Sequence, residues 1–195
     1  MPISINGSGT VTGVSVGGLP DGIVDADMLA NNAVTPAKRG TASILQIVQS
    51  TNNDREAKSS NTYVATNKSV TITPLVASSK IHLIFTGDVN TEANGRPVFL
   101  DIYRSINGGT FAGIAPVGSG QTVGANNNNG FSGEIRGSSS RIQVPFVINY
   151  LDSPTYTLGN AIEYKIYIRS DGNQVEIPSN NLAQPVILMA MEIAG

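Results

Sequence analysis

The chain of 195 residues has no cysteine, a single histidine and few charged residues. Without cysteine there is no disulfide scaffold, no thiolate zinc site and no thiol nucleophile. A serine triad would have to use His82, which lies among apolar residues of a strand-like segment, so we expect a structural histidine there. Charged residues make up 13% of the chain, about half of the usual ~25%. The surface must therefore be covered largely by uncharged polar residues.

Charge of one sign and long apolar runs are also absent. The 12 basic and 14 acidic residues give a net charge of −2, with no block of like sign, whereas binding to nucleic-acid phosphates calls for a basic stripe. No segment approaches the ~18 consecutive apolar residues of a membrane span. The N-terminus also lacks the basic region and apolar stretch of a signal peptide. We therefore expect neither nucleic-acid binding nor membrane insertion.

Motifs for enzymatic chemistry fail on their spacing. Two glycine-rich stretches, 7–13 and 118–124, resemble dinucleotide loops, but each has one residue too many and neither opens a helix. The acidic residues of 21–27 are in the wrong order for an EF-hand calcium loop, although a cation at a subunit interface stays open. A glycan-cleaving enzyme would need two carboxylates facing each other across a cleft, and those of the strands are scattered. We expect no catalytic residue, no metal ligand and no cofactor.

The character of the sequence changes near residue 40. The first forty residues hold short apolar clusters between glycines, with too little apolar area for a core of their own. From residue 41 onward, apolar residues alternate with polar ones in the pattern of half-buried strands. We therefore divide the chain into an extended N-terminal arm, 1–40, which must be covered by something else, and an all-β head, 41–195.

Strand character recurs along the head, and no segment has a convincing helical period. Clean alternation turns Leu83, Leu100 and Ile166 toward the expected core. Asp171-Gly172 predicts a tight hairpin between the strands that flank it, and Pro145 predicts an edge or bulge position. The main strands are expected at 43–50, 69–73, 80–87, 98–105, 142–151, 162–170, 174–177 and 186–193, with short ones at 110–114 and 131–135. The fold class is therefore all-β, a sandwich or barrel of jelly-roll type.

The last expected strand, 186–193, has no polar face. Such a strand needs either a central position in a sheet or a partner subunit to cover it. Because the arm also needs covering, we expect an oligomer whose subunits wrap one another, and we take it to be an intertwined homotrimer. The residues expected near the subunit interface are Val186, Ile187, Leu188, Met189, Met191 and Ile193.

The interval 107–140 is long for a loop and contains a run of four asparagines. Loops of this length usually carry function or short strands of their own. A glycan site without catalytic machinery needs amides that bond to hydroxyl groups and an exposed aromatic ring for stacking. Ordinary loop solubility explains an asparagine run equally well. The candidate binding residues are Phe111, Asn126, Asn127, Asn128, Asn129, Phe131 and Arg136.

Both parts of the chain resemble one class of protein. The arm contains DGIVDADMLANNAVTPAK, at 21–38, which is similar to units in the N-terminal stretches of marine, cyanophage-like bacteriophage tail fibre and virion appendage proteins. The head resembles a module of the same proteins. The matching stretches of the head are SILQIVQSTNND, SVTITPLVASSKIHLIFTGDV, VINYLDSP, IEYKIYIRSDGNQVEI and VILMAMEIAG.

The resemblance implies a trimeric, jelly-roll-like β-sandwich head that is made in the host cytoplasm and joined to other virion proteins by residues 1–40. The function that we favour is a short tail fibre or receptor-binding appendage, whose head contacts a glycan or protein of the host surface. The alternative is a capsid decoration (cement) protein that stabilises the phage shell, and a glycan-cleaving enzyme is the least favoured. The arm favours the fibre, whereas the lack of repeated shaft units favours decoration or a very short fibre.

Overall fold

The computed structural model describes residues 33–91, 97–116, 130–131, 135–136, 142–179 and 184–195. The chain divides into two units, Met1–Thr35 and Pro36–Gly195, and the description below concerns the second. Most of the predicted arm, 1–40, lies outside the described residues. The described residues form strands and one 3₁₀ turn at Pro36–Lys38, so the predicted all-β class is confirmed.

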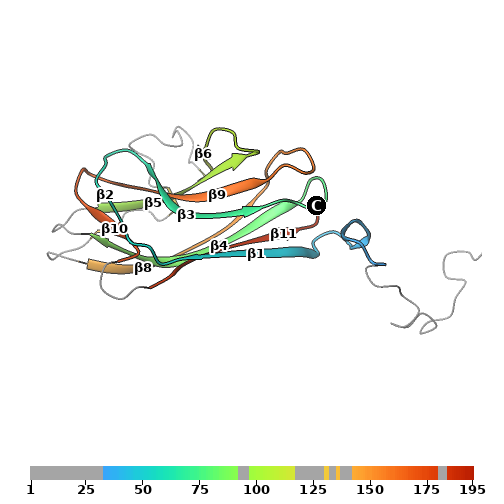
Figure 1. Ribbon diagram of the computed structural model, residues 1–195, viewed down its shortest axis with the longest axis horizontal. Coiled ribbons are helices and arrows are strands. Elements are labelled where there is room, and N and C mark those ends of the chain that lie inside the picture. Colours follow the sequence, from blue (N-terminus) through green and yellow to red (C-terminus); the bar gives the residue numbers. More distant parts are fainter. Residues whose placement is uncertain (1–32, 92–96, 117–129, 132–134, 137–141, 180–183) are drawn as a thin grey trace, which may run out of the picture. The chain divides into compact units, whose positions relative to one another are not determined.

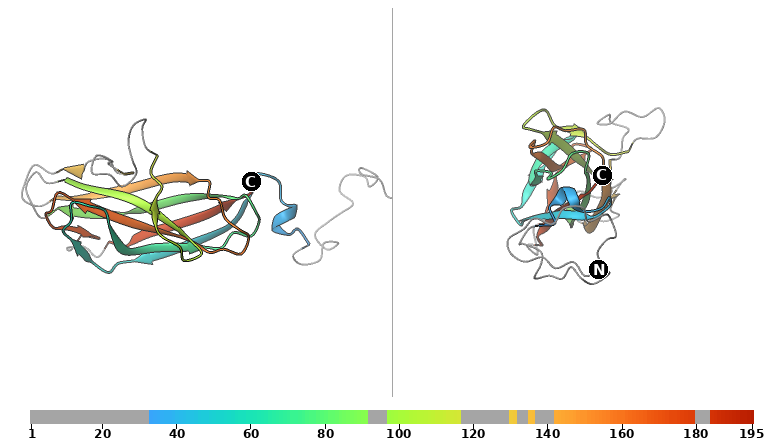
Figure 2. Two further views of the ribbon diagram at one scale, coloured as in Figure 1. Left: turned by 90° about the horizontal axis from the view of Figure 1, so that it is seen from above. Right: turned by 90° about the vertical axis from the view of Figure 1, so that its right-hand side faces the viewer.

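The strands form two antiparallel sheets. Sheet A contains β1 (Ile44–Asn52), β2 (Glu56–Lys58), β4 (Lys80–Thr91), β8 (Ile142–Asp152), β10 (Val175–Ile177) and β11 (Val186–Ile193). Sheet B contains β3 (Val64–Ile72), β5 (Pro97–Ile106), β6 (Ala112–Gly113), β7 (Ile135–Arg136) and β9 (Ile162–Ser170). Figure 1 shows the sheets as the two layers of a sandwich, and in the left view of Figure 2 the long strands of both layers run lengthwise along it.

The pairing order places the last strand inside sheet A. That sheet has the order β1-β11-β4-β10-β2, and β8 pairs with the other edge of β4 along its whole length. Sheet B has the order β3-β9-β5-β6, with β7 also paired to β5. Among the described strands, β8 pairs with β4 alone, so Pro145 is in an edge strand, where its missing N–H breaks no ladder bond, and this prediction is confirmed.

The predicted hairpin at Asp171-Gly172 is wrong. The strand before it, β9, belongs to sheet B, whereas β10 pairs with β2 and β4 in sheet A. Gly172 does adopt a positive φ of 95°, which is the conformation that such a dipeptide favours. The dipeptide therefore specifies a turn, but the turn carries the chain from one sheet to the other.

Strand boundaries differ from the prediction where polar residues are buried. The strands at 162–170 and 186–193 have the predicted bounds, but β3 begins at Val64 rather than at residue 69. Its first half contains buried Thr66 and Lys68 and a register shift between Ala65 and Ser69. The Thr66 hydroxyl donates to the carbonyl of Ile166 at 2.8 Å. Inward polar residues break the apolar alternation, so the sequence pattern missed this half of the strand, and it also missed the short strand β2.

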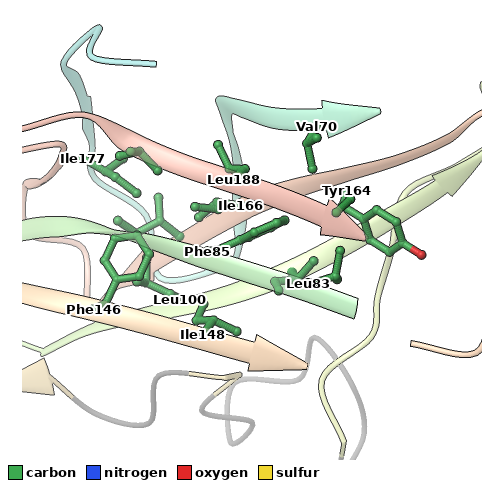
Figure 3. Close-up of a cluster of buried hydrophobic side chains, with 14 of the residues drawn as sticks. Val70, Leu83, Phe85, Leu100, Phe146, Ile148, Tyr164, Ile166, Ile177 and Leu188 are labelled. Atoms are coloured by element: carbon green, nitrogen blue, oxygen red, sulfur yellow. The ribbon is translucent and has the colours of Figure 1, made fainter. Parts of the chain in front are cut away.

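Apolar side chains from both sheets fill the space between them. Leu83, Phe85 and Leu188 from sheet A meet Leu100 and Ile166 from sheet B, and none of these side chains is exposed. Figure 3 shows them pointing into one common cluster. The predicted inward faces of the strands at 80–87, 98–105 and 162–170 are therefore confirmed.

Buried polar side chains form hydrogen bonds at two edges of this core. The carboxylate of Asp152 accepts bonds from Arg104 Nη1 at 2.6 and 2.7 Å and from the Tyr164 hydroxyl at 2.8 Å. Burial is the main reason why the pKa of Tyr164 lies above its ordinary value, so this hydroxyl stays a donor. On β11, buried Glu192 accepts bonds from Gln46 Nε2 at 2.7 Å and from the Ser79 hydroxyl at 2.7 Å. Glu192 thus ties the last strand to β1 and to the segment that leads into β4.

Candidate functional site

The outer face of sheet A is the side of β1, β11, β4 and β8 that points away from sheet B. On β11 the burial alternates, so that Val186 and Leu188 point into the core and their neighbours point outward. The structure therefore supplies the central sheet position that a strand without a polar face needs. Val186 and Leu188 have no exposed surface, so their assignment to a subunit interface is wrong. The other four predicted interface residues, Ile187, Met189, Met191 and Ile193, lie half-buried on the outer face.

The strand register places apolar residues beside one another across this face. Ile47 of β1 is paired with Met191, and Ile84 of β4 is paired with Met189. On the far side of β4, Val147 of β8 is paired with Thr86. We call this set the apolar face; its members are Ile44, Ile47, Ile84, Pro145, Val147, Leu151, Ile187, Met189, Met191 and Ile193.

Exposed apolar side chains of the described residues are concentrated on the apolar face. Seven large apolar side chains of the described residues are exposed, and four of them belong to this face: Ile44 at 51%, Ile47 at 56%, Val147 at 71% and Leu151 at 48%. Four strands about 4.8 Å apart, each roughly eight residues of about 3.4 Å long, cover on the order of 500 Å². This area includes the polar residues Gln49, Thr51, Thr86 and Asn149. Its apolar part therefore lies within the range of the largest patch on a typical monomer, about 300–600 Å², which is often functional.

Charged groups on this face lie only at its two ends, among the described residues. Lys80 is exposed at one end of β4, and Asp88 is buried at the other. Asp88 accepts bonds from Gln143 Nε2 at 2.5 Å and from the backbone N–H of Ser179 at 3.3 Å. Between these ends the one titratable side chain of the described face is His82, whose Nε2 lies 2.6 Å from Asn149 Oδ1.

The outer face of sheet B has a different composition. The rings of Tyr103 and Tyr167 stack with centroids 3.8 Å apart, and Phe111 lies 6.0 Å from Tyr167. The ammonium of Lys165 lies 4.6 Å from the Phe111 ring, and the guanidinium of Arg169 lies 3.9 Å from the Phe99 ring. Aromatic rings and cations therefore cover one another on this face, as cation–π pairs do.

The chain itself covers part of this face at Asp101. The Asp101 side chain has no exposed surface, and its Oδ1 accepts the backbone N–H of Ile102 at 2.7 Å. Burial raises the pKa of Asp101 to about 7, against the opposing effect of bonds from the N–H groups of Ile102 and Ala115. A side chain at Gly130 would come within 2.3 Å of the Leu100 carbonyl and 3.0 Å of Asp101 Cβ. Glycine therefore lets the backbone at residue 130 lie close against the Leu100 carbonyl and Asp101 Cβ.

The predicted loop site is not assembled among the described residues. Phe111 lies on the outer face of sheet B, whereas the Phe131 ring packs against the core, edge-on to Tyr150 at 4.9 Å. Arg136 belongs to β7, opposite Pro97. The four asparagines 126–129 lie outside the described residues. Phe131 thus has a packing role in the head, and no sequence signal distinguished it from an exposed aromatic residue.

The chain matches no family model and no curated protein. Within the described ranges, no three histidine, aspartate or glutamate side chains are grouped as metal ligands. The same residues contain no helix that is long and apolar enough to cross a membrane.

Proposed function

We propose that this chain is a structural protein of a bacteriophage virion, a short tail fibre or receptor-binding appendage without enzymatic activity. Its heads assemble as a homotrimer, and the apolar face of sheet A is the observation that carries this proposal. The virion role is supported by the resemblance of residues 21–38 and of the head to marine phage appendage proteins. In this proposal the arm, 1–40, joins other virion proteins and the head contacts a glycan or protein of the host surface.

We take the sandwich to be a jelly roll. The main strands run β1-β11-β4-β8 in one sheet and β3-β9-β5-β6 in the other. This order is the one expected when eight strands are wound as two Greek keys, an arrangement that recurs in viral capsid and lectin domains. The strand order therefore supports a virion head, although the same fold serves many other functions.

Further copies of this chain are the occupant that best fits the apolar face. Its centre carries no charged group among the described residues, so rotation-related copies would not bring like charges together. Three copies that contribute on the order of 500 Å² each would bury roughly 1,500 Å² together, which is about 500 Å² for each of the three subunit contacts and the size of a weak contact. A ring of three also closes, which leaves no apolar face for open-ended growth.

The oligomer is tested by placing a carboxylate on the apolar face. The full chain should sediment as three copies at micromolar concentration, and Met189→Asp or Met191→Asp should give folded monomers. An unpaired carboxylate at an apolar interface costs several kcal/mol. Leu158→Asp is the matched control, because Leu158 is exposed and apolar but lies in the loop between β8 and β9. A wild-type chain that stays monomeric would contradict the proposal.

The alternative proposal is a capsid decoration protein, which would use the same trimer and the same arm. The lack of repeated shaft units supports it. A density map of the intact particle separates the two, because a fibre sits on the tail and a decoration protein on the capsid lattice. Deleting residues 1–40 should leave trimeric heads that fail to join the virion. Normal incorporation of the truncated protein would contradict the attachment role.

A further inference from the structure

The chain contains one histidine, and the structure places it on the apolar face. His82 is half-buried on the outer side of β4, paired with Met191 of β11 on one side and with Leu151 of β8 on the other. Its Nε2 lies 2.6 Å from Asn149 Oδ1, so the ring can donate this hydrogen bond both in its neutral Nε2–H tautomer and in its charged form. Its immediate neighbours across the sheet are therefore uncharged.

Charged groups elsewhere on sheet A are arranged so that none balances a charge on His82. On the outer side, Lys80 is two residues away along β4, and Asp88 at the far end is engaged by Gln143 and Ser179. The titratable groups on the neighbouring strands, Glu192 of β11 with Tyr150 and Asp152 of β8, alternate to the inner side of the sheet. No described carboxylate of the subunit therefore faces the imidazole.

The surroundings of the His82 ring differ between the free subunit and the assembled one. In the free subunit, water reaches the half-buried ring. An interface over the apolar face would remove that water, and a buried charge without a partner is strongly disfavoured. Histidine is the side chain that ordinarily changes charge between about pH 5 and about pH 8.

We propose that His82 makes assembly of this chain sensitive to proton concentration: the assembled heads hold the imidazole neutral, and its protonation in mildly acidic solution separates them. This inference rests on the proposed function, since it needs the apolar face to be covered by other copies. Each trimer contains three such histidines. Where the free subunit is protonated, the association constant falls by up to about a thousandfold for each pH unit, tenfold for each histidine.

The association test compares sedimentation of the full chain across a concentration series near pH 7.5 and near pH 5.0. We expect trimers at the higher pH and dissociation at the lower one. The matched variant is His82→Gln, which keeps a donor for Asn149 and cannot become charged, so it should stay trimeric at both values. Trimers that persist equally near pH 5.0, or a His82→Gln variant that dissociates like the wild type, would overturn the inference but leave the proposed trimer intact.

A second measurement needs no change at His82. The single histidine gives a single set of imidazole resonances in a proton NMR spectrum. Its protonation midpoint in the wild-type trimer should lie at least about one pH unit below that in the monomeric Met189→Asp variant, because assembly opposes the charged form. Equal midpoints would overturn the inference. Absence of trimers at every pH would instead refute the proposed function, and this inference with it.

Discussion

The two outer faces of the sandwich differ in what covers them. On sheet B, aromatic rings and cations lie against one another, and backbone N–H groups of Ile102 and Ala115 bond to the buried carboxyl group of Asp101. On sheet A, apolar residues of four strands lie side by side, and Val147 and Ile47 keep more than half of their surface exposed. Both sheets contribute to the same core, so the difference is confined to the sides that face away from it.

The comparison illustrates how a covering partner would constrain the composition of a sheet face. Where the chain covers its own sheet, backbone N–H groups can be placed against a specific carboxylate, as those of Ile102 and Ala115 are against Asp101. Rotation-related copies cannot do this as freely, because any charge near the symmetry axis approaches its own copies. A face that is built for identical partners is therefore expected to be apolar and uncharged, as the face around Met189 is.

We expect the largest effect on stability from a comparison of two adjacent residues of β11, one that faces the core and one that faces outward. Leu188→Asp places a carboxylate in the core and removes a buried leucine, at a free-energy cost comparable with the whole stability of a domain, about 5–15 kcal/mol. Met189→Asp, one residue away, faces outward and should leave a folded monomer. Circular dichroism and urea unfolding check both. A Leu188→Asp head that unfolds cooperatively near the wild-type midpoint would contradict the inward position of this side chain.

The next effect concerns the covered carboxyl group of sheet B. Folded chains keep the proton on Asp101 up to about pH 7, whereas an unfolded chain loses it near pH 4. The folded state therefore binds more protons between these values, so the free energy of unfolding should fall as the pH rises from about 4 to about 7. Asp101→Asn should remove this fall and raise stability near pH 8 by an amount on the order of a few kcal/mol.

Urea unfolding of the Met189→Asp monomer with and without Asp101→Asn, near pH 5 and near pH 8, measures this effect without a contribution from assembly. Asp54→Asn is the matched control, because Asp54 is exposed. If Asp101→Asn and Asp54→Asn change the pH dependence equally, burial of the Asp101 carboxyl group is not its cause.

The smallest expected effect on stability comes from truncating one side chain on each outer face. Phe111→Ala removes a half-buried ring that contacts Tyr167 and Lys165, and it should lower the free energy of unfolding by about 1–2 kcal/mol. Val147→Ala removes the most exposed apolar side chain of sheet A and should change monomer stability by less than about 0.5 kcal/mol. Thermal unfolding of both variants in the monomeric background provides the measurement. Equal losses would mean that the two faces are covered alike.

The alternation of apolar and polar residues along the sequence predicted most of the strands. It could not predict which distant segments pair with one another. The inward positions of Leu83, Leu100 and Ile166 followed from the strand period, because alternate residues of a strand share a face. The sheet to which β10 belongs did not follow, because Asp171-Gly172 specifies only the local backbone of a turn. The first half of β3 was hidden for a related reason, since Lys68 is buried and bonds to the carbonyl of Asp54.

The sequence pattern identified only part of the candidate interface. Lack of a polar face on 186–193 pointed to this strand, but only the sheet order assigns one side of it to the core and the other to the surface. The contributions of Ile47, Val147 and Leu151 come from strands more than thirty residues away in the sequence. Their proximity depends on register, which no local pattern encodes. The same applies to Asp101, whose buried carboxyl group accepts a bond from the backbone N–H of Ala115, outside its own strand.

The central place of β11 also affects the order in which the head can form during synthesis. Residues 186–193 leave the ribosome after every other strand of the sandwich, yet they pair with β1, where Ile193 lies opposite Ile44. Until they arrive, the nascent chain presents the unpaired edges of β1 and β4 together with an open core, a state that is prone to wrong pairing. Since β11 also supplies one of the two inner rows of the apolar face, a prematurely terminated copy lacks both a closed core and the strand on which the proposed trimer depends. If the proposed trimer forms, translation itself would then act as the quality control that keeps defective copies out of it.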